Sequence, residues 1–279
     1  MSKRIGTISI IIPSRYQSTR LPGKPLIKIA GVELVKRVAD IAAYVCGLQE
    51  GCTYKVATDD ERIANFCNDN AIPVVMTRSD CESGTERCWD AVLSDAVKPD
   101  LIVNMQGDNP LCPPQIIQAL INSWRENPDA DLFTPAVQLD WNEYDRIIET
   151  KKITPHSGTT VLVDKMNFAL AFSKAVLPMI RNIDNAKKRL PVSPVRRHIG
   201  IYAYTLATLE RYIDLPQSCY ELSCIEGLEQ MRFLENGMKI KVVPVNYQGR
   251  KTTSGVDSPE DIKRTEAIIT EFGEILNQF

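Results

Sequence analysis

Short apolar runs alternate with amphipathic segments through the first half of the chain. Residues 8–12 are an isoleucine-rich run that ends at Pro13, which is typical of a central strand buried on both faces. Residues 33–44 then place apolar side chains at helical spacing, which predicts a helix. The alternation continues with predicted strands at 54–57, 74–76 and 101–105 and predicted helices at 60–69, 85–93 and from Pro113 and Pro114 onward.

This alternation predicts the α/β class, with a doubly wound and mostly parallel sheet. In such sheets, ligands bind beyond the carboxyl ends of the strands. We therefore expect the functional residues in the loops that follow Ile12, Ala57, Met76 and Met105.

The middle of the chain, residues 131–205, has a different pattern. A polar stretch at 181–189 interrupts it and is predicted to be a mobile loop. The strand-like runs of this region lie at 132–137, 159–163, 168–172 and 199–204. We interpret residues 1–279 as a single domain that carries a small, strand-rich inserted subdomain at 131–205.

The last part of the chain returns to the earlier pattern. It predicts a helix at 221–236, a strand at 240–245 and a closing helix at 259–276. Ser258 stands directly before Pro259, and Asp261 follows three residues later, which is typical of a helix N-terminus.

Composition and charge narrow the function classes. Hydrophobic residues make up 44% and charged residues 24% of the chain, and the formal net charge is −2. This balance excludes a bulk basic field for nucleic-acid or membrane-surface binding. The apolar runs are too short to span a bilayer, and Pro13 interrupts the only run near the N-terminus. We therefore expect a cytoplasmic protein that binds neither nucleic acid nor membrane.

The cysteines do not predict a metal centre. The chain has 8 cysteines, none in a CxxC pair, and 2 histidines to complete a zinc site, so structural zinc is not expected. We interpret the cysteines as reduced thiols, several of them in the core.

The loop after the first predicted strand concentrates positive charge. It contains Arg15, Arg20, Gly23 and Lys24 within a few residues of Pro13. Cations, hydroxyls and a glycine that permits close approach favour binding of a triphosphate. The GxxxxGK[ST] spacing of a Walker A loop is absent, and a solvated basic turn is the alternative.

Two carboxylates follow glycine-containing turns. Asp108 comes after the predicted strand 101–105 and stands next to Gly107, and Asp257 follows Gly255 before the closing helix. Mg²⁺ takes one or two protein carboxylates and completes its shell with water and phosphate oxygens. These two residues are therefore the candidate Mg²⁺ ligands. The alternative for Asp257 is a helix N-terminal residue that interacts with the helix dipole.

A third motif opens the predicted helix 85–93. Ser83 and Gly84 precede Thr85, and such helix openings bind anions or the polar edge of a base. An ordinary helix N-cap is the alternative.

Together these motifs resemble the 3-deoxy-manno-octulosonate cytidylyltransferases (CMP-Kdo synthetases), which have the nucleotide-diphospho-sugar transferase type of fold. The shared motifs occur in the family's order between about residues 5 and 270. They are IPSRYQSTRLPGKPL (12–26), ATD (57–59), TRSDCESGTER (77–87), VNMQGDNP (103–110), RHIGIYAY (197–204), LEQMRFLENG (228–237) and GVDSPED (255–261).

The resemblance implies transfer of CMP from CTP to the anomeric hydroxyl of a 3-deoxy-2-ulosonic acid, with release of pyrophosphate, to activate a sugar for lipopolysaccharide or capsule. It implies that Arg15, Lys24, Asp108 and Asp257 are catalytic and that Asp108 and Asp257 hold Mg²⁺. The residues that it assigns to the nucleotide are Pro13, Arg15, Arg20, Gly23, Lys24, Arg78, Ser83, Gly84 and Gln106. Those that it assigns to the sugar are Lys174, His198, Tyr202, Glu229 and Gln230. It also implies a homodimer with the subdomain near the interface.

The chain departs from the family pattern mainly in its middle region. Lys174 replaces an arginine usual in the family's FSRA segment, and lysine cannot bind a carboxylate in the same bidentate way. Asn109 replaces a usual glutamate, and segments 154–162 and 184–194 appear longer than in relatives. Kdo, 8-amino-Kdo and another ulosonic acid therefore remain alternative acceptors.

Two other classes of protein are alternatives to this interpretation. A glycosyltransferase of similar architecture would carry a DxD-like metal motif, which residues 108–110 do not form. A non-catalytic nucleotide-sugar binding protein would have no need of both Asp108 and Asp257.

Overall fold

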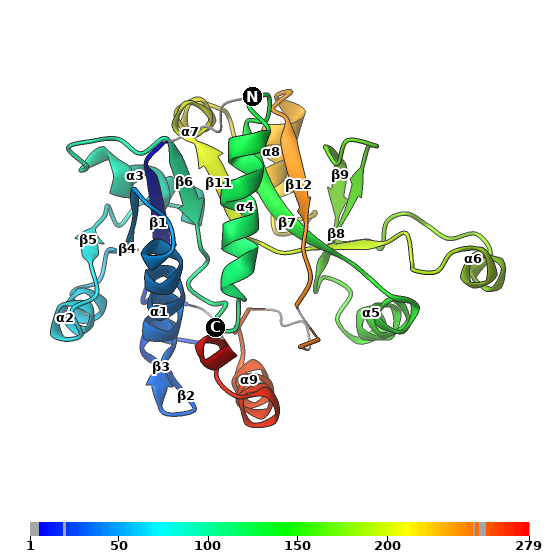
Figure 1. Cartoon of the computed structure of the whole chain (residues 1–279), viewed down its shortest axis with the longest axis horizontal. Helices are drawn as coiled ribbons and strands as arrows, with labels where there is room; N and C mark the ends of the chain where they lie inside the picture. Colours follow the sequence, from blue (N-terminus) through cyan, green and yellow to red (C-terminus); the bar gives the residue numbers. More distant parts are fainter. Residues whose placement is uncertain (1–5, 19–20, 248, 251–254, 279) are drawn as a thin grey trace.

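A computed structural model describes residues 6–18, 21–247, 249–250 and 255–278. Within these ranges, one sheet of ten strands runs through the molecule (Figure 1). Its strand order is β5-β4-β1-β6-β11-β7-β10-β8-β9. β11 and β10 pair with successive parts of β7, and β12 also pairs with β7, outside this order. The strands are β1 (Ile8–Pro13), β4 (Cys52–Thr58), β5 (Val74–Met76), β6 (Leu101–Asn104), β7 (Leu132–Gln138), β8 (Thr159–Val163), β9 (Ala169–Ser173), β10 (Arg196–His198), β11 (Tyr202–Thr205) and β12 (Ile240–Pro244).

The N-terminal half of the sheet is parallel. β1 pairs in parallel with β4 and β6, and β4 pairs in parallel with β5. The helices that connect and follow these strands are α1 (Leu34–Gly47), α2 (Glu61–Asp69), α3 (Gly84–Leu93) and α4 (Pro114–Glu126). Ile10, Ile11 and Ile12 are fully buried, as expected of a central strand covered on both faces. The predicted doubly wound, mostly parallel α/β fold is confirmed.

Helices cover both faces of the sheet. On one face, α1 and α4 pack side by side in front of the sheet (Figure 1), and their apolar residues form one core with the strands. On the other face, a second core joins α3 with α7 (Leu206–Ile213) and α8 (Gln230–Glu235). The 3₁₀ turn η1 (Lys24–Leu26) and the small hairpin of β2 (Lys28–Ile29) and β3 (Val32–Glu33) connect β1 to α1.

The strands of residues 131–205 belong to the same large sheet. β11 is antiparallel to β6 and β7, and β10, β8 and β9 extend the sheet as antiparallel neighbours. Helices α5 (Trp141–Ile153) and α6 (Ile183–Arg189) extend from this end, at the opposite side of the molecule from α2 (Figure 1). That residues 131–205 bind the sugar and lie near a dimer interface stays a prediction.

Three local predictions in the second half of the chain were wrong. The polar stretch 181–189 contains α6, which begins after the cap of Asn182. The predicted strand 199–204 begins only at Tyr202, in β11, because the chain leaves the sheet between His198 and Tyr202. The predicted helix 221–236 is reduced to η2 (Cys219–Glu221) and α8. Gly227, at φ 62°, takes the left-handed conformation that ends a helix.

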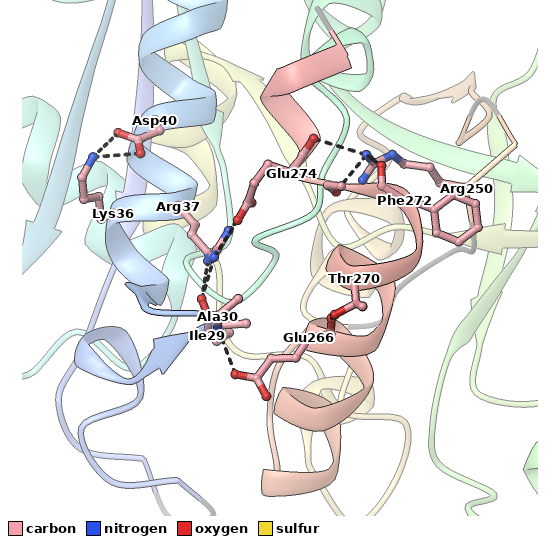
Figure 2. Close-up of polar contacts among 11 residues, drawn as sticks. Ile29, Ala30, Lys36, Arg37, Asp40, Arg250, Glu266, Thr270, Phe272 and Glu274 are labelled. Atoms are coloured by element: carbon pink, nitrogen blue, oxygen red, sulfur yellow. Dashed lines mark hydrogen bonds and ion pairs between the residues drawn. The ribbon is translucent and has the colours of Figure 1, made fainter.

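The C-terminal helix α9 (Pro259–Phe272) is fastened to α1. Ser258 and Asp261 form the predicted capping box at its start. Buried Arg37 of α1 pairs with Glu274 in the segment before η3 (Ile275–Gln278), and the Glu266 carboxylate accepts from the Ala30 backbone N–H (Figure 2). These contacts hold the middle of α9 and the segment after it against the N-terminal half of the molecule.

No helix within the described ranges is long and apolar enough to cross a membrane.

Candidate active site

A cavity of about 810 Å³ opens at the carboxyl ends of the parallel strands, where ligands of such sheets are expected. It is walled by the loops after β1 and β6, the start of α3, the region around β10 and the segment before α9. The predicted site residues that line it are Pro13, Arg15, Lys24, Ser83, Gly84, Gln106, Asp108, Lys174, His198, Tyr202, Glu229, Gln230 and Asp257.

Two predicted nucleotide-binding residues of the described chain, Gly23 and Arg78, do not line the cavity. Gly23 has φ 67°, and a Cβ there would lie 3.0 Å from Tyr16 Cζ, so this position requires glycine for backbone reasons. The side chain of Arg78 is 62% exposed, and its Nε lies 3.0 Å from an Asp90 carboxylate oxygen. Arg20 lies outside the described residues.

Lys24 joins the two candidate metal ligands. Its Nζ lies 3.2 Å from Asp108 Oδ2 and 3.1 Å from Asp257 Oδ1. The loops that carry these carboxylates are also bonded directly, because the Val256 N–H donates to the Asp108 carbonyl oxygen at 2.8 Å. A Cβ at Gly255 would lie only 2.8 Å from Asp108 Cγ, so glycine is needed for the two loops to meet.

This cluster places two carboxylates against one ammonium group. Burial raises the pKa of Asp108, and Asp257 raises it further, while Lys24 acts in the opposite direction. Burial acts to lower the pKa of Lys24, but the two carboxylates outweigh it and the pKa is raised. The cluster therefore favours a charged Lys24 and gains from additional positive charge beside Asp108.

The neighbouring wall presents a polar amide and a helix start. Gln106 Nε2 donates to Asn104 Oδ1 at 3.2 Å, and Ser83 caps α3 by accepting from the Glu86 N–H. A Cβ at Gly84 would lie 3.2 Å from Gln106 Nε2. The glycine thus leaves room for the amide beside the helix N-terminus, a position suited to a polar base edge or an anion.

The opposite wall is built from side chains that are already hydrogen-bonded within the protein. His198 Nε2 lies 2.7 Å from Thr134 Oγ1, and Tyr202 OH donates to Gln230 Oε1 at 3.0 Å. Burial, with a smaller contribution from Lys174, lowers the pKa of His198 to about 3. His198 is therefore a neutral ring that can exchange hydrogen bonds with a polar ligand.

Two ionisable groups on this wall are also shifted toward their neutral forms. Glu229 accepts from Thr85 Oγ1 at 2.8 Å, and burial raises its pKa to about 7. Lys174 donates to Thr159 Oγ1 at 3.1 Å, and burial lowers its pKa despite the opposing effect of Glu226. These shifts follow from desolvation, which disfavours charge.

Arg197 is a cavity residue that was not singled out by sequence. Its Nε and Nη2 are buried and have no hydrogen-bond partner in the described part of the chain, and burial lowers its pKa. A signal was available, because Arg197 opens the RHIGIYAY motif directly before His198. A buried guanidinium without an acceptor is costly, which indicates a position for an anion.

Comparisons with known proteins identify the family of the chain. A family model described as Cytidylyltransferase matches residues 9–240. The chain is 42% identical to the 3-deoxy-manno-octulosonate cytidylyltransferase of Maricaulis maris (strain MCS10), over 97% of this chain and 100% of that protein. It is 34% identical to the protein of that name from Zea mays, over 93% of this chain and 80% of the relative.

The chain belongs to the 3-deoxy-manno-octulosonate cytidylyltransferase family. A solved structure described as CMP:2-keto-3-deoxy-manno-octonic acid synthetase complexed with CTP superposes with a TM-score of 0.80 at 31% identity, covering 95% of this chain and 99% of the other. A 4-diphosphocytidyl-2C-methyl-D-erythritol synthase from Anaerococcus prevotii DSM 20548 matches at 14% identity with a TM-score of 0.56, which concerns the fold alone. Membership makes this cytidylyltransferase a nucleotidyltransferase, as predicted.

Proposed function

We propose that this cytidylyltransferase transfers CMP from CTP to the anomeric hydroxyl of a 3-deoxy-2-ulosonic acid such as Kdo and releases pyrophosphate. The observation that carries the proposal is the convergence of Lys24, Asp108 and Asp257 within 3.2 Å in a cavity at the carboxyl ends of the sheet. The names of the relatives and the CTP bound to the structural neighbour support the same reaction.

In this proposal, one side of the cavity takes the nucleotide. Arg15 and Lys24 neutralise the phosphates, and Arg20 retains this role as a prediction from sequence. Pro13, Ser83, Gly84 and Gln106 are assigned to the cytidine, for which the Gln106 amide offers a donor and an acceptor. Gly23 and Arg78, which do not line the cavity, act from outside it: Gly23 shapes the loop, and Arg78 pairs with Asp90.

Asp108 and Asp257 fit a magnesium ion. Their oxygens already hold one cation, the Lys24 ammonium, between them, and no third acidic, histidine or cysteine side chain joins them within the described ranges. Two carboxylates completed by water and phosphate oxygens are the usual set for Mg²⁺. Bound there, the metal would supply charge stabilisation for the phosphates and make the sugar hydroxyl more acidic. Arg15 and Lys24 would orient the phosphates for in-line attack.

The other side of the cavity takes the sugar acid. His198, Tyr202, Gln230 and Glu229 offer neutral hydrogen-bonding groups, which suit a polyhydroxylated ligand because each unpaired buried polar group costs about 1–3 kcal/mol. Lys174 supplies the cationic end of this wall.

Arg197 supports an acidic sugar as the substrate that receives CMP. Its N–H groups lack an acceptor in the described protein, and a substrate carboxylate would satisfy them with charge-assisted hydrogen bonds. Gly158 and Thr159, from the altered segment 154–162, also line this wall. Two of the departures from the family pattern, Lys174 and the segment 154–162, therefore lie where they would affect the sugar, and 8-amino-Kdo or another ulosonic acid is the alternative substrate.

The cellular setting is part of the same proposal. We place the enzyme in the cytoplasm, in sugar activation for lipopolysaccharide or capsule, and as a homodimer that uses residues 131–205. Two strongly exposed apolar side chains lie in this segment: Ile153 at the end of α5 is 84% exposed, and Met179 before α6 is 80% exposed. Sedimentation equilibrium tests the dimer, and a concentration-independent monomer mass would contradict it.

The reaction is tested by pyrophosphate release from CTP and Mg²⁺ with Kdo, 8-amino-Kdo and a nonulosonic acid. We expect turnover with one acceptor, loss of turnover on chelation of the metal, and no turnover by Asp108→Ala. CTP binding without turnover on any acceptor would support the non-catalytic alternative instead.

A further inference from the structure

Two cysteines meet at the edge of the sheet opposite the cavity. Cys46 lies in the last turn of α1, and Cys52 is the first residue of β4. Their Sγ atoms are 2.8 Å apart. Because Cys52 pairs with Ile8 at the start of β1, the pair sits at the amino ends of the parallel strands, remote from Asp108 and Asp257.

The turn between the two cysteines holds both in place. The Cys52 N–H donates to the Gln49 carbonyl oxygen at 3.2 Å, and the Ile8 N–H donates to that of Gly51 at 3.0 Å. A disulfide bond is about 2.0 Å long, so the sulfur atoms need to approach by less than about 1 Å. The backbone therefore already brings the two thiols almost to bonding distance.

The environment distinguishes the two thiols. Both are partly exposed, so small reagents can reach them. The hydrogen bond with Cys46, in which either sulfur can donate, lowers the pKa of Cys52, and nearby Arg125 adds to this against the effect of burial. The same hydrogen bond, together with burial, raises the pKa of Cys46. The positive charge of Arg125 favours Cys52 as the thiolate of the pair, and thiolates are the attacking species in disulfide exchange.

We propose that Cys46 and Cys52 form a reversible oxidation site, which takes a low-molecular-weight disulfide as its oxidant and closes to an intramolecular disulfide. The Cys52 thiolate attacks one sulfur of the reagent, forms a mixed disulfide and releases one thiolate. Cys46 then loses its proton to solvent and attacks Cys52 Sγ, which releases the second thiolate. Two protein thiols are oxidised, and one small disulfide is reduced to two thiols after protonation.

The bond would fasten α1 to β4 without reaching the cavity. We therefore expect turnover with CTP to change less than about two-fold on oxidation. The midpoint of thermal unfolding should rise by about a few degrees, because a short closed loop restricts the unfolded chain.

The test uses the full chain with the exposed Cys219 and Cys224 replaced by serine. The protein is equilibrated with mixtures of reduced and oxidised glutathione, blocked with N-ethylmaleimide and mapped by mass spectrometry. We expect a peptide linked through Cys46 and Cys52, whose fraction follows the ratio of the squared reduced to the oxidised glutathione concentration. Dithiothreitol should restore both free thiols.

A single substitution separates this site from general thiol reactivity. In Cys46→Ser, the reaction should stop at a glutathione adduct on Cys52, with no linked peptide and no rise in the unfolding midpoint. The unsubstituted chain is the oxidant control, since Cys219 and Cys224 should react there. If Cys46 and Cys52 stay fully alkylated under conditions that oxidise those exposed thiols, the proposal is overturned.

Discussion

The two sides of the cavity handle charge in opposite ways. On the side of Lys24, Asp108 and Asp257, two carboxylates share one ammonium group in direct contact. On the side of His198, Tyr202 and Glu229, burial and internal hydrogen bonds hold the side chains neutral. The first arrangement suits phosphates and a metal ion, and the second suits hydroxyl groups. The contrast implies that substitutions on the first side affect turnover and those on the second affect the acceptor.

The largest effect is expected from Asp108→Asn. It keeps the shape of the side chain but removes a charge that Lys24 contacts, so kcat for pyrophosphate release should fall about 10³-fold. The matched control is Asp40→Asn, which removes a carboxylate paired with Lys36 on the surface of α1. A near-normal kcat in Asp108→Asn would show that the Asp108 carboxylate is not needed for the reaction.

A smaller loss is expected from Gly255→Ala. The added Cβ would lie 2.8 Å from Asp108 Cγ and displace a carboxylate, and a displacement of about 1 Å costs about 10²-fold in rate. Gly47→Ala is the control, since a Cβ there meets nothing within 4 Å. Equal kcat values for the two variants would show that the close approach of the loops does not matter to the reaction.

Arg197→Met should separate the two sides of the cavity. Loss of a charge-assisted contact should raise KM for the sugar acid about 10-fold or more with little change in KM for CTP. Because the guanidinium has unpartnered N–H groups, its removal should not lower the unfolding free energy.

Arg196→Met is the neighbouring control, since Arg196 donates to Asn167. An Arg197→Met protein that is destabilised and has an unchanged acceptor KM would make Arg197 a structural residue.

The smallest effect concerns pH and Glu229. Its pKa of about 7 in the folded protein exceeds the ordinary value, so the folded state holds a proton that the unfolded state has lost. The unfolding free energy should therefore fall by about 2 kcal/mol as pH rises from about 5 to about 8.

Glu229→Gln should remove this slope in urea unfolding, whereas Glu235→Gln, on the exposed end of α8, should leave it in place. If the unfolding free energy of Glu229→Gln still falls with pH, the pH dependence arises from another group.

Sequence patterns were most reliable where local chemistry decides the outcome. The buried strand β1 and the capping box of Ser258 were predicted because apolar runs and helix caps act over a few residues. The helix predicted at 221–236 was wrong, since Gly227 and the packing of the following segment override its apolar spacing. The interruption between His198 and Tyr202 arises from pairing with two different parts of β7, which no local pattern contains.

By itself, the sequence determined the fold class, the family and the residue types of the site, because strand–helix alternation and clustered motifs are local properties. Only the tertiary structure decided which of those residues share a cavity. Arg78 and Arg197 are both arginines within family motifs, yet one pairs with Asp90 near the surface and the other has no acceptor in the described protein. Burial and partners distinguish them, and both depend on segments far apart in the chain.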